Sequence, residues 1–253
     1  MIQDQLLLSN WPEGTLPLWA LDKTSGLDCL TVIIRLINSH LTLEERSATH
    51  PVRQLEEHNQ LLRHAWLDFC PGEKEKHVRA KVSVFEALSL RNGPSFKELV
   101  SSESLNSTIW ARWDHNFNFF PIASELVSGS HRTARSAYFS ITRSNTSASL
   151  DLGALIDQDV DKGTPTDSLC YNNPDFLRLY YTPADGDEAG LEELQTMSIR
   201  DRRSITQHFG DPVSHGRVRY VLRAAVRLVR NTGASCDCIQ VFSNSGENSY
   251  PGS

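Results

Sequence analysis

The sequence predicts an α+β fold, with helices and strands in different halves of the chain. Apolar residues recur at helical spacing through the first half, whereas short runs of β-branched and aromatic residues dominate the second. Helices that are segregated to one side of an antiparallel sheet define this class. At 253 residues the chain is long enough for one sizeable core. We therefore expect a single domain over residues 1–253, helical over 1–130 and β-rich over 131–253.

The helical half is predicted to contain three main helices and one short turn of helix. Residues 29–39 carry apolar side chains on nearly every face, which indicates a buried helix with Asp28 as its N-cap. Residues 52–68 and 76–91 are amphipathic, and residues 96–100 form the short turn. The apolar stripe of the third helix consists of Val78, Val82, Phe85 and Leu88.

The second half is predicted to alternate between strands and polar connections. Residues 157–190 are rich in Asp, Gly, Pro and Asn and are expected to form a long loop or insertion, interrupted by a short apolar piece at residues 176–181. Residues 191–207 could hold a helix. The predicted strands are residues 137–142, 150–156, 218–229 and 238–243.

Composition excludes several classes of function. The formal net charge of -6 argues against a nucleic-acid or anionic-membrane surface. No apolar run approaches the roughly 20 residues of a membrane helix, and residues 1–8 lack the features of a secretory signal. The cysteine count of five, without a signal, indicates reduced thiols in a cytoplasmic or nuclear protein. We expect no cofactor and no metal.

Cys29 stands at the predicted start of the buried helix. A helix N-terminus carries partial positive charge, so a thiol there loses its proton more readily and becomes a better nucleophile. The charge of Asp28 would oppose thiolate formation. The alternative is that Cys29 is a small buried side chain of the core.

Three separated segments, in the same order, resemble the ubiquitin-specific protease family. The first runs from Thr24 to Cys29, where Gly26 and Cys29 match the cysteine box that opens the central helix of that family. The second, residues 135–143 with 150–156, is similar to two successive strands of the family. The third, residues 220–226 with 233–239, resembles the strand and turn that carry the catalytic histidine.

The resemblance implies a papain-like fold, with a helical thumb around a central buried helix and an antiparallel β palm. It implies Cys29 as the nucleophile and Thr24 as the residue in place of the oxyanion-stabilising asparagine. Asp237 occupies the position of the histidine, and an aspartate is not a near-neutral base. Asn244 and Asn248 are the nearest candidates for the final orienting residue. The zinc-binding finger of the family is absent, so no structural zinc is expected.

Three functions follow as alternatives. The chain could hydrolyse bonds at the C-terminus of ubiquitin or a related modifier through its thiol, with His208 or His215 as a replacement base. It could instead keep the fold without the chemistry, as a ubiquitin-binding or scaffold module. It could also be an unrelated α+β interaction domain with a structural Cys29.

Other conspicuous residues have structural interpretations beside functional ones. The aromatic cluster of residues 110–120 is expected in the core, with a recognition surface as the alternative. Alternating arginines are expected on a solvated strand face, with a docking surface for an acidic partner as the alternative. These are Arg217, Arg219, Arg223, Arg227 and Arg230. The remaining histidines considered, His64, His77 and His115, are expected at the surface or on helix flanks.

Overall fold

The structure is a computed structural model of the chain, and it divides into two compact units. The first unit is formed by Met1–Ala111 with Ala224–Val241, and the second by Arg112–Arg223 with Phe242–Pro251. The residues that the structure describes are 24–40, 58–65, 74–89, 94–110, 117–119, 135–143, 151–162, 171–183, 192–202, 216–228 and 237–242. Both helices and strands are present, as the sequence predicts for an α+β protein.

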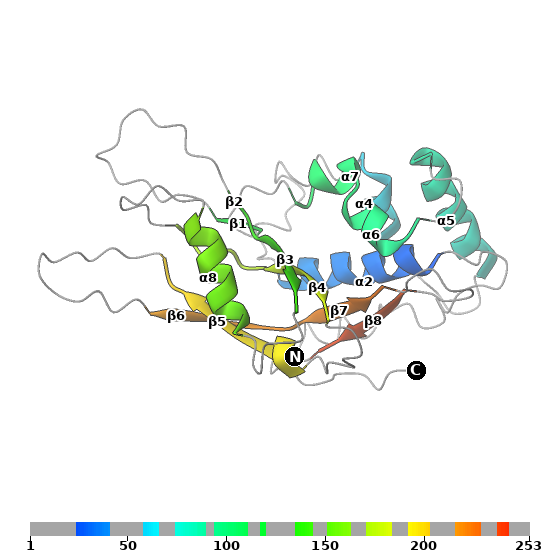
Figure 1. Cartoon of the computed structure of the whole chain (residues 1–253). Helices are drawn as coiled ribbons and strands as arrows, with labels where there is room; N and C mark the ends of the chain where they lie inside the picture. The colour runs from blue at the N-terminus through cyan, green and yellow to red at the C-terminus, as the bar shows by residue number, and fades with distance from the viewer. Residues whose placement is uncertain are drawn as a thin grey trace, which may run out of the picture. The chain divides into compact units, whose positions relative to one another are not determined.

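Helix α2 is the central element of the first unit (Figure 1). It spans Ser25–His40 and buries side chains on most of its faces, as its uniform apolar composition predicts. It contacts α4, α6 and strand β8, which are Gln60–Ala65, Phe96–Val100 and Cys238–Val241. The prediction of a buried core helix is confirmed.

The other helices of this unit lie on one side of α2 in Figure 1. Helix α5 spans Lys74–Ala87, close to the predicted bounds, and α7 spans Glu103–Asn106. Helix α6 begins with a capping box, in which Ser95 and Glu98 exchange hydrogen bonds with each other's backbone. Of the helix predicted over residues 52–68, the described part contains α4 alone.

The first unit also contains an antiparallel pair of strands from the C-terminal part of the chain. Strand β7 spans Ala224–Arg227 and pairs with β8, with Ala224 opposite Val241. The strands predicted over residues 218–229 and 238–243 are therefore present. The first of them is broken at Leu222 and Arg223.

The second unit contains a parallel pair of strands with a helix between them in sequence. Strand β3, Tyr138–Thr142, pairs in parallel with β4, Arg178–Thr182, and α8 is Leu152–Lys162. The two-residue strands β1 and β2, Asn118–Phe119 and Arg135–Ser136, form a short antiparallel pair. The expectation of a purely antiparallel palm is wrong for the pair β3–β4.

Helix α8 lies where a strand was predicted over residues 150–156 and where the loop predicted over 157–190 was expected to begin, so both predictions are wrong here. The Asp151 side chain accepts a hydrogen bond from the Ala154 backbone at 3.0 Å, which stabilises the first turn of a helix. Leu152, Ile156 and Val160 then share one buried face at helical spacing. Because this segment supplied one of the strands in the family resemblance, its helical state weakens that part of the resemblance.

An antiparallel pair follows in the second unit, where a helix was predicted over residues 191–207. The helix α9 is limited to Glu192–Gln195 and leads into strand β5, Thr196–Arg200. Strand β5 pairs with β6, Arg217–Val221, with Arg200 opposite Arg217. Met197 and Ile199 are two positions apart and both face the core, which is the spacing of a strand.

The core of the second unit gathers side chains from α8 and the strands. Phe119 and Phe139 meet edge to face, with ring centroids 6.3 Å apart. Trp110 in the first unit and Phe117 and Phe119 in the second are buried, which confirms the core interpretation for the described residues of that aromatic cluster. Among the described residues, no helix is long and apolar enough to cross a membrane.

Candidate functional site

Thr24, rather than Asp28, marks the start of the Cys29 helix. The Thr24 carbonyl accepts hydrogen bonds from the backbones of Leu27 and Asp28, at 3.0 and 3.1 Å. Asp28 lies in the first turn of α2. The expectation that Asp28 is the N-cap is therefore wrong, because the helix starts earlier than its apolar run indicates.

Cys29 is consequently placed inside α2 and not at its mouth. It is the fifth residue of a helix that begins at Ser25, and its exposure is 3%. Cys29 and Cys238 are thiols rather than disulfide partners, and Cys238 is exposed. The partial charge at a helix terminus acts mainly within the first turn, so it acts less on Cys29 than on Ser25 or Gly26.

A buried lysine organises the start of α2. The Lys81 ammonium, from α5, donates to Asp28 Oδ2 at 2.8 Å and lies 2.6 Å from Asp28 Oδ1. It also donates to Thr24 Oγ1 at 3.4 Å, and Thr24 Oγ1 donates to Asp28 Oδ2 at 3.5 Å. Thr24 and Lys81 are each 1% exposed. We call these three residues the Lys81 cluster.

In the Lys81 cluster, burial and ion pairing have opposite effects on the pKa of Asp28. Burial raises the pKa of Asp28 above its usual value of 3.8, and this effect is larger than the opposite effects of the Lys81 charge and of the hydrogen bonds from Lys81 and Thr24. The Thr24 hydroxyl is held by two partners of this cluster. Asp28 and Lys81 therefore orient the Thr24 hydroxyl within the fold.

Gly26 allows the start of α2 to approach the segment before α6. A Cβ at Gly26 would meet the Phe96 backbone nitrogen, and it would lie 2.7 Å from the Pro94 carbonyl oxygen. The contacts are with backbone, which has little freedom to move away. This glycine has a packing role whether or not the segment is a cysteine box.

Asp237 lies beside the start of α2. Its backbone N–H donates to Ser25 Oγ at 3.0 Å, across 212 residues of sequence. Its carboxylate accepts a hydrogen bond from the Phe96 backbone N–H at 2.8 Å, at the first residue of α6. Asp237 thus ties together strand β8, α2 and α6.

The structure brings the predicted residues Thr24, Cys29 and Asp237 into one region around the start of α2. Sequence reasoning missed Lys81, although the sequence contains a signal for it. Lys81 follows Val78 by three residues and precedes Phe85 by four, so it falls on the apolar stripe of the predicted helix. A lysine on such a stripe requires a buried anionic partner.

Of the histidines and terminal asparagines named from the sequence, only His64 has a side chain that the structure describes. His64 is 2% exposed on α4, so the expectation of a surface position is wrong; the amphipathic helix turns this residue toward the core. The side chain of His77 lies outside the described residues. So do His115, His208, His215, Asn244 and Asn248.

Comparison with known proteins gives no relative. No family model matches the chain, and neither a curated protein nor a solved structure is significantly similar to it.

Proposed function

We propose that this chain is a non-catalytic binding module of the ubiquitin-specific-protease type, in which the region of the catalytic centre has become part of the scaffold. The observation that carries the proposal is the use of Asp237. Its carboxylate caps α6 through Phe96, and its backbone binds Ser25. The carboxylate is directed to the backbone at the start of α6, so Asp237 joins structural elements at the position where the resemblance expects a base.

The surroundings of Cys29 support the same proposal. The thiol is almost fully buried, whereas a nucleophile must meet the carbonyl of its substrate. The neighbouring Asp28 carboxyl is occupied by Lys81. Both polar residues that flank the thiol in the resemblance, Thr24 and Asp28, therefore serve a buried ion pair.

The position of Asp237 beside the first turn of α2 keeps thiol-dependent hydrolysis as a second candidate. It matches the adjacency that the resemblance implies between the cysteine helix and the histidine turn. In that case Cys29 would attack the C-terminal carbonyl of ubiquitin or a related modifier, and a base other than Asp237 would be needed.

A ubiquitin with an electrophilic C-terminus distinguishes the two candidates. The unaltered chain and Cys29→Ala are incubated with this probe, and adducts are measured by intact mass spectrometry. The proposal expects no adduct that depends on Cys29, together with saturable binding of unmodified ubiquitin in a titration. A Cys29-dependent adduct would select the hydrolase, and absence of both adduct and binding would overturn both candidates.

A further inference from the structure

The outer face of the pair β5–β6 carries arginines side by side. Opposed residues of an antiparallel pair share a face, so Arg200 and Arg217 lie on one face together with Ser198 and Arg219. The opposite face, with Ile199 and partly buried neighbours, packs into the core. Arg217 and Arg219 are exposed.

The nearby carboxylates are largely engaged with other groups. Asp157 lies 2.9 Å from the buried Arg202 guanidinium and accepts the Arg200 backbone N–H at 2.9 Å. Asp161 pairs with Arg200 at 3.3 Å and Arg202 at 3.2 Å. Arg217 is only within 3.8 Å of Asp157.

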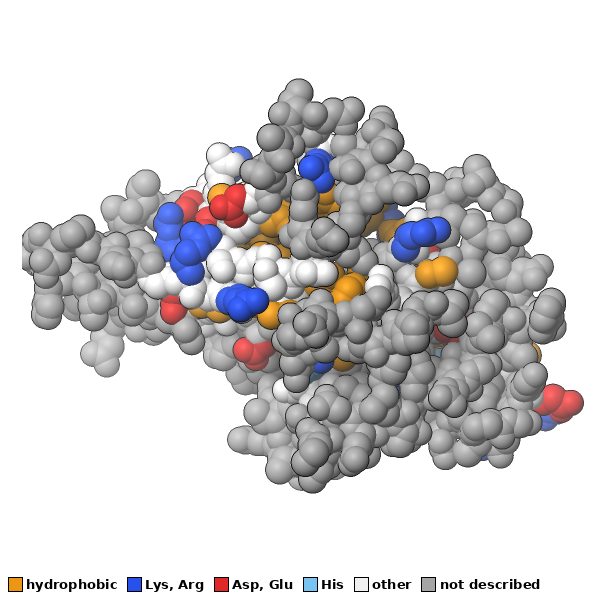
Figure 2. Space-filling view, turned by 90° about the horizontal axis from the view of Figure 1, so that it is seen from below, with side chains coloured by type: hydrophobic (Ala, Val, Ile, Leu, Met, Phe, Trp, Pro, Cys, Tyr) orange, Lys and Arg blue, Asp and Glu red, His pale blue; other side chains and the backbone are white. Residues whose placement is uncertain are grey.

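Arg217 and Arg219 are therefore the least neutralised side chains of this face. No ion pair joins Arg219 to a carboxylate in the described part of the chain. In Figure 2, several blue side chains gather on this part of the second unit, with red side chains beside them.

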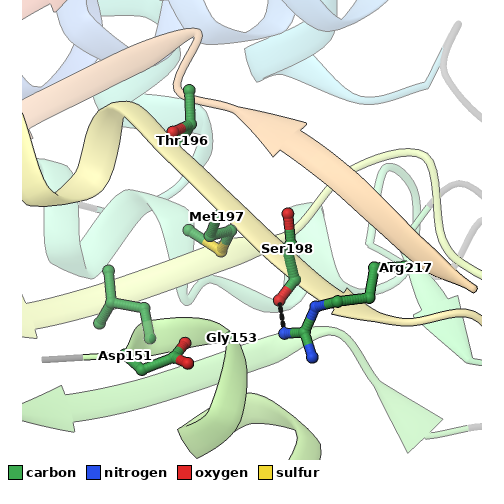
Figure 3. Close-up of a pocket in the computed structure, with 7 residues that line it drawn as sticks. Asp151, Gly153, Thr196, Met197, Ser198 and Arg217 are labelled. Atoms are coloured by element: carbon green, nitrogen blue, oxygen red, sulfur yellow. Dashed lines mark hydrogen bonds between the residues drawn. The ribbon is translucent and has the colours of Figure 1, made fainter.

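A polar hollow adjoins the arginines. It has a volume of about 280 Å³ and lies between the start of α8, strand β5 and Arg217. Figure 3 shows the Arg217 guanidinium bound to the Ser198 carbonyl, with Met197 and Thr196 further along β5. The lining of the hollow combines Thr196, Ser198 and the exposed Arg217 with the Asp151 carboxylate, so only its Arg217 side suits an anionic group.

We propose that this arginine face, defined by Arg200, Arg217 and Arg219 with the adjoining hollow, docks an acidic extended segment of a protein partner. Charge complementarity identifies the occupant, because Arg219, which pairs with no carboxylate among the described residues, and Arg217, whose pairing is long, attract carboxylates and speed their encounter. This surface does not depend on the function proposed for the region around Cys29.

A peptide suits the face better than a nucleic acid does. The Asp151 carboxylate lines the same hollow and would repel a continuous row of phosphates. The net charge of -6 would repel a long polyanion over the rest of the surface. A segment with a few spaced carboxylates carries less charge, and it can place a neutral residue beside Asp151 and a carboxylate at Arg217 or Arg219.

The test uses a fluorescein-labelled decapeptide of alternating Glu and Ser, with the matching Gln–Ser peptide as a neutral control. Anisotropy titrations are made at low and at physiological ionic strength. We expect Arg217→Gln/Arg219→Gln to weaken binding of the Glu peptide roughly fivefold or more. Raised salt should weaken it too, because the contacts are exposed.

Matched controls keep the result interpretable. Arg79→Gln removes an exposed arginine from α5, with a side chain 82% exposed, and should leave binding unchanged. Arg219→Gln alone keeps the Arg217 hydrogen bond and separates charge from any folding defect. Equal losses in Arg79→Gln, equal binding of the Gln peptide, or tighter binding of a length-matched oligothymidine would each overturn the proposal.

Discussion

Lys81 and Asp28 form an ion pair of 2.6 Å in a place where only 1% of the lysine side chain is exposed. A charge removed from water in this way is tolerated only when it is paired and hydrogen-bonded. The pair joins α5 to the first turn of α2. It fixes the helix that carries Cys29 through electrostatics, in addition to apolar packing.

Lys81→Met should therefore destabilise the protein strongly. The substitution keeps much of the side-chain volume but leaves the Asp28 carboxyl buried without its cation, so we expect a loss of about 3–5 kcal/mol in the free energy of unfolding. Urea denaturation measures it. Arg79→Met, on the exposed face of the same helix, should change stability by less than about 0.5 kcal/mol.

The double variant Asp28→Leu/Lys81→Met separates pairing from volume. It removes both charges, so it should be markedly more stable than Lys81→Met alone. If Lys81→Met and Arg79→Met had similar effects, the buried pair would not exist in solution.

Gly26→Ala tests the close approach of α2 to α6. In an ordinary exposed helix this change would stabilise by about 1 kcal/mol. Here the added Cβ meets backbone around Phe96, so we expect destabilisation of about 1–3 kcal/mol in thermal or urea unfolding.

Gly216→Ala is the control for Gly26→Ala. Its Cβ would meet only the Asp201 side chain, at an ordinary 3.8 Å. A stabilising Gly26→Ala would show that the start of α2 does not lie against α6.

The two described thiols should differ sharply in reactivity. Cys238 is exposed and Cys29 is buried, so brief treatment with iodoacetamide should alkylate Cys238 and spare Cys29 until urea unfolds the protein. Peptide mass spectrometry after a timed quench reads each site separately. Rapid native alkylation of Cys29, abolished in Cys29→Ala, would contradict its burial and favour the hydrolase.

The capping box of α6 should give a pH-dependent contribution to stability. Hydrogen bonds from the Ser95 backbone and side chain lower the pKa of Glu98 below its usual value of 4.5. Since the folded pKa is lowered, this stabilisation is present above pH 4.5 and is lost as the pH falls through the folded pKa. An NMR titration of the Glu98 carboxyl checks the direction of the shift.

Ser95→Ala should return the Glu98 pKa toward 4.5 and destabilise the protein by about 0.5–2 kcal/mol. Ser102→Ala is the matched control, because Ser102 precedes α7 without a side-chain capping bond. Equal effects of the two substitutions would argue against the capping box.

The sequence predicts the elements whose periodicity is simple and fails where local and tertiary signals compete. The buried helix α2, the short helix α6 and the strands β7 and β8 follow from their apolar patterns. Residues 150–156 have an alternating start that favours a strand, but Asp151 and the spacing of Leu152, Ile156 and Val160 produce a helix. Residues 196–200 become a strand because β6 pairs with them, which local propensity does not reveal.

The sequence predicts which residues form the candidate site better than it predicts how they are arranged. Thr24, Cys29 and Asp237 can be named from the sequence, and the structure places them around one helix start. The burial of Cys29 was not predictable, because it depends on where α2 begins. The partner of Asp28 was not predictable either, since Lys81 reaches it from a helix 53 residues away in sequence.

The bond between Ser25 and Asp237 also has a consequence for biosynthesis. Its partners are 212 residues apart, and the first unit takes β7 and β8 from the far side of the second in the sequence. A ribosome therefore synthesises every residue of Arg112–Arg223 before the strands that complete the first unit have been made. Part of the apolar surface of the nascent helices therefore stays uncovered until β7 and β8 have been made, and a chaperone would protect it during that interval.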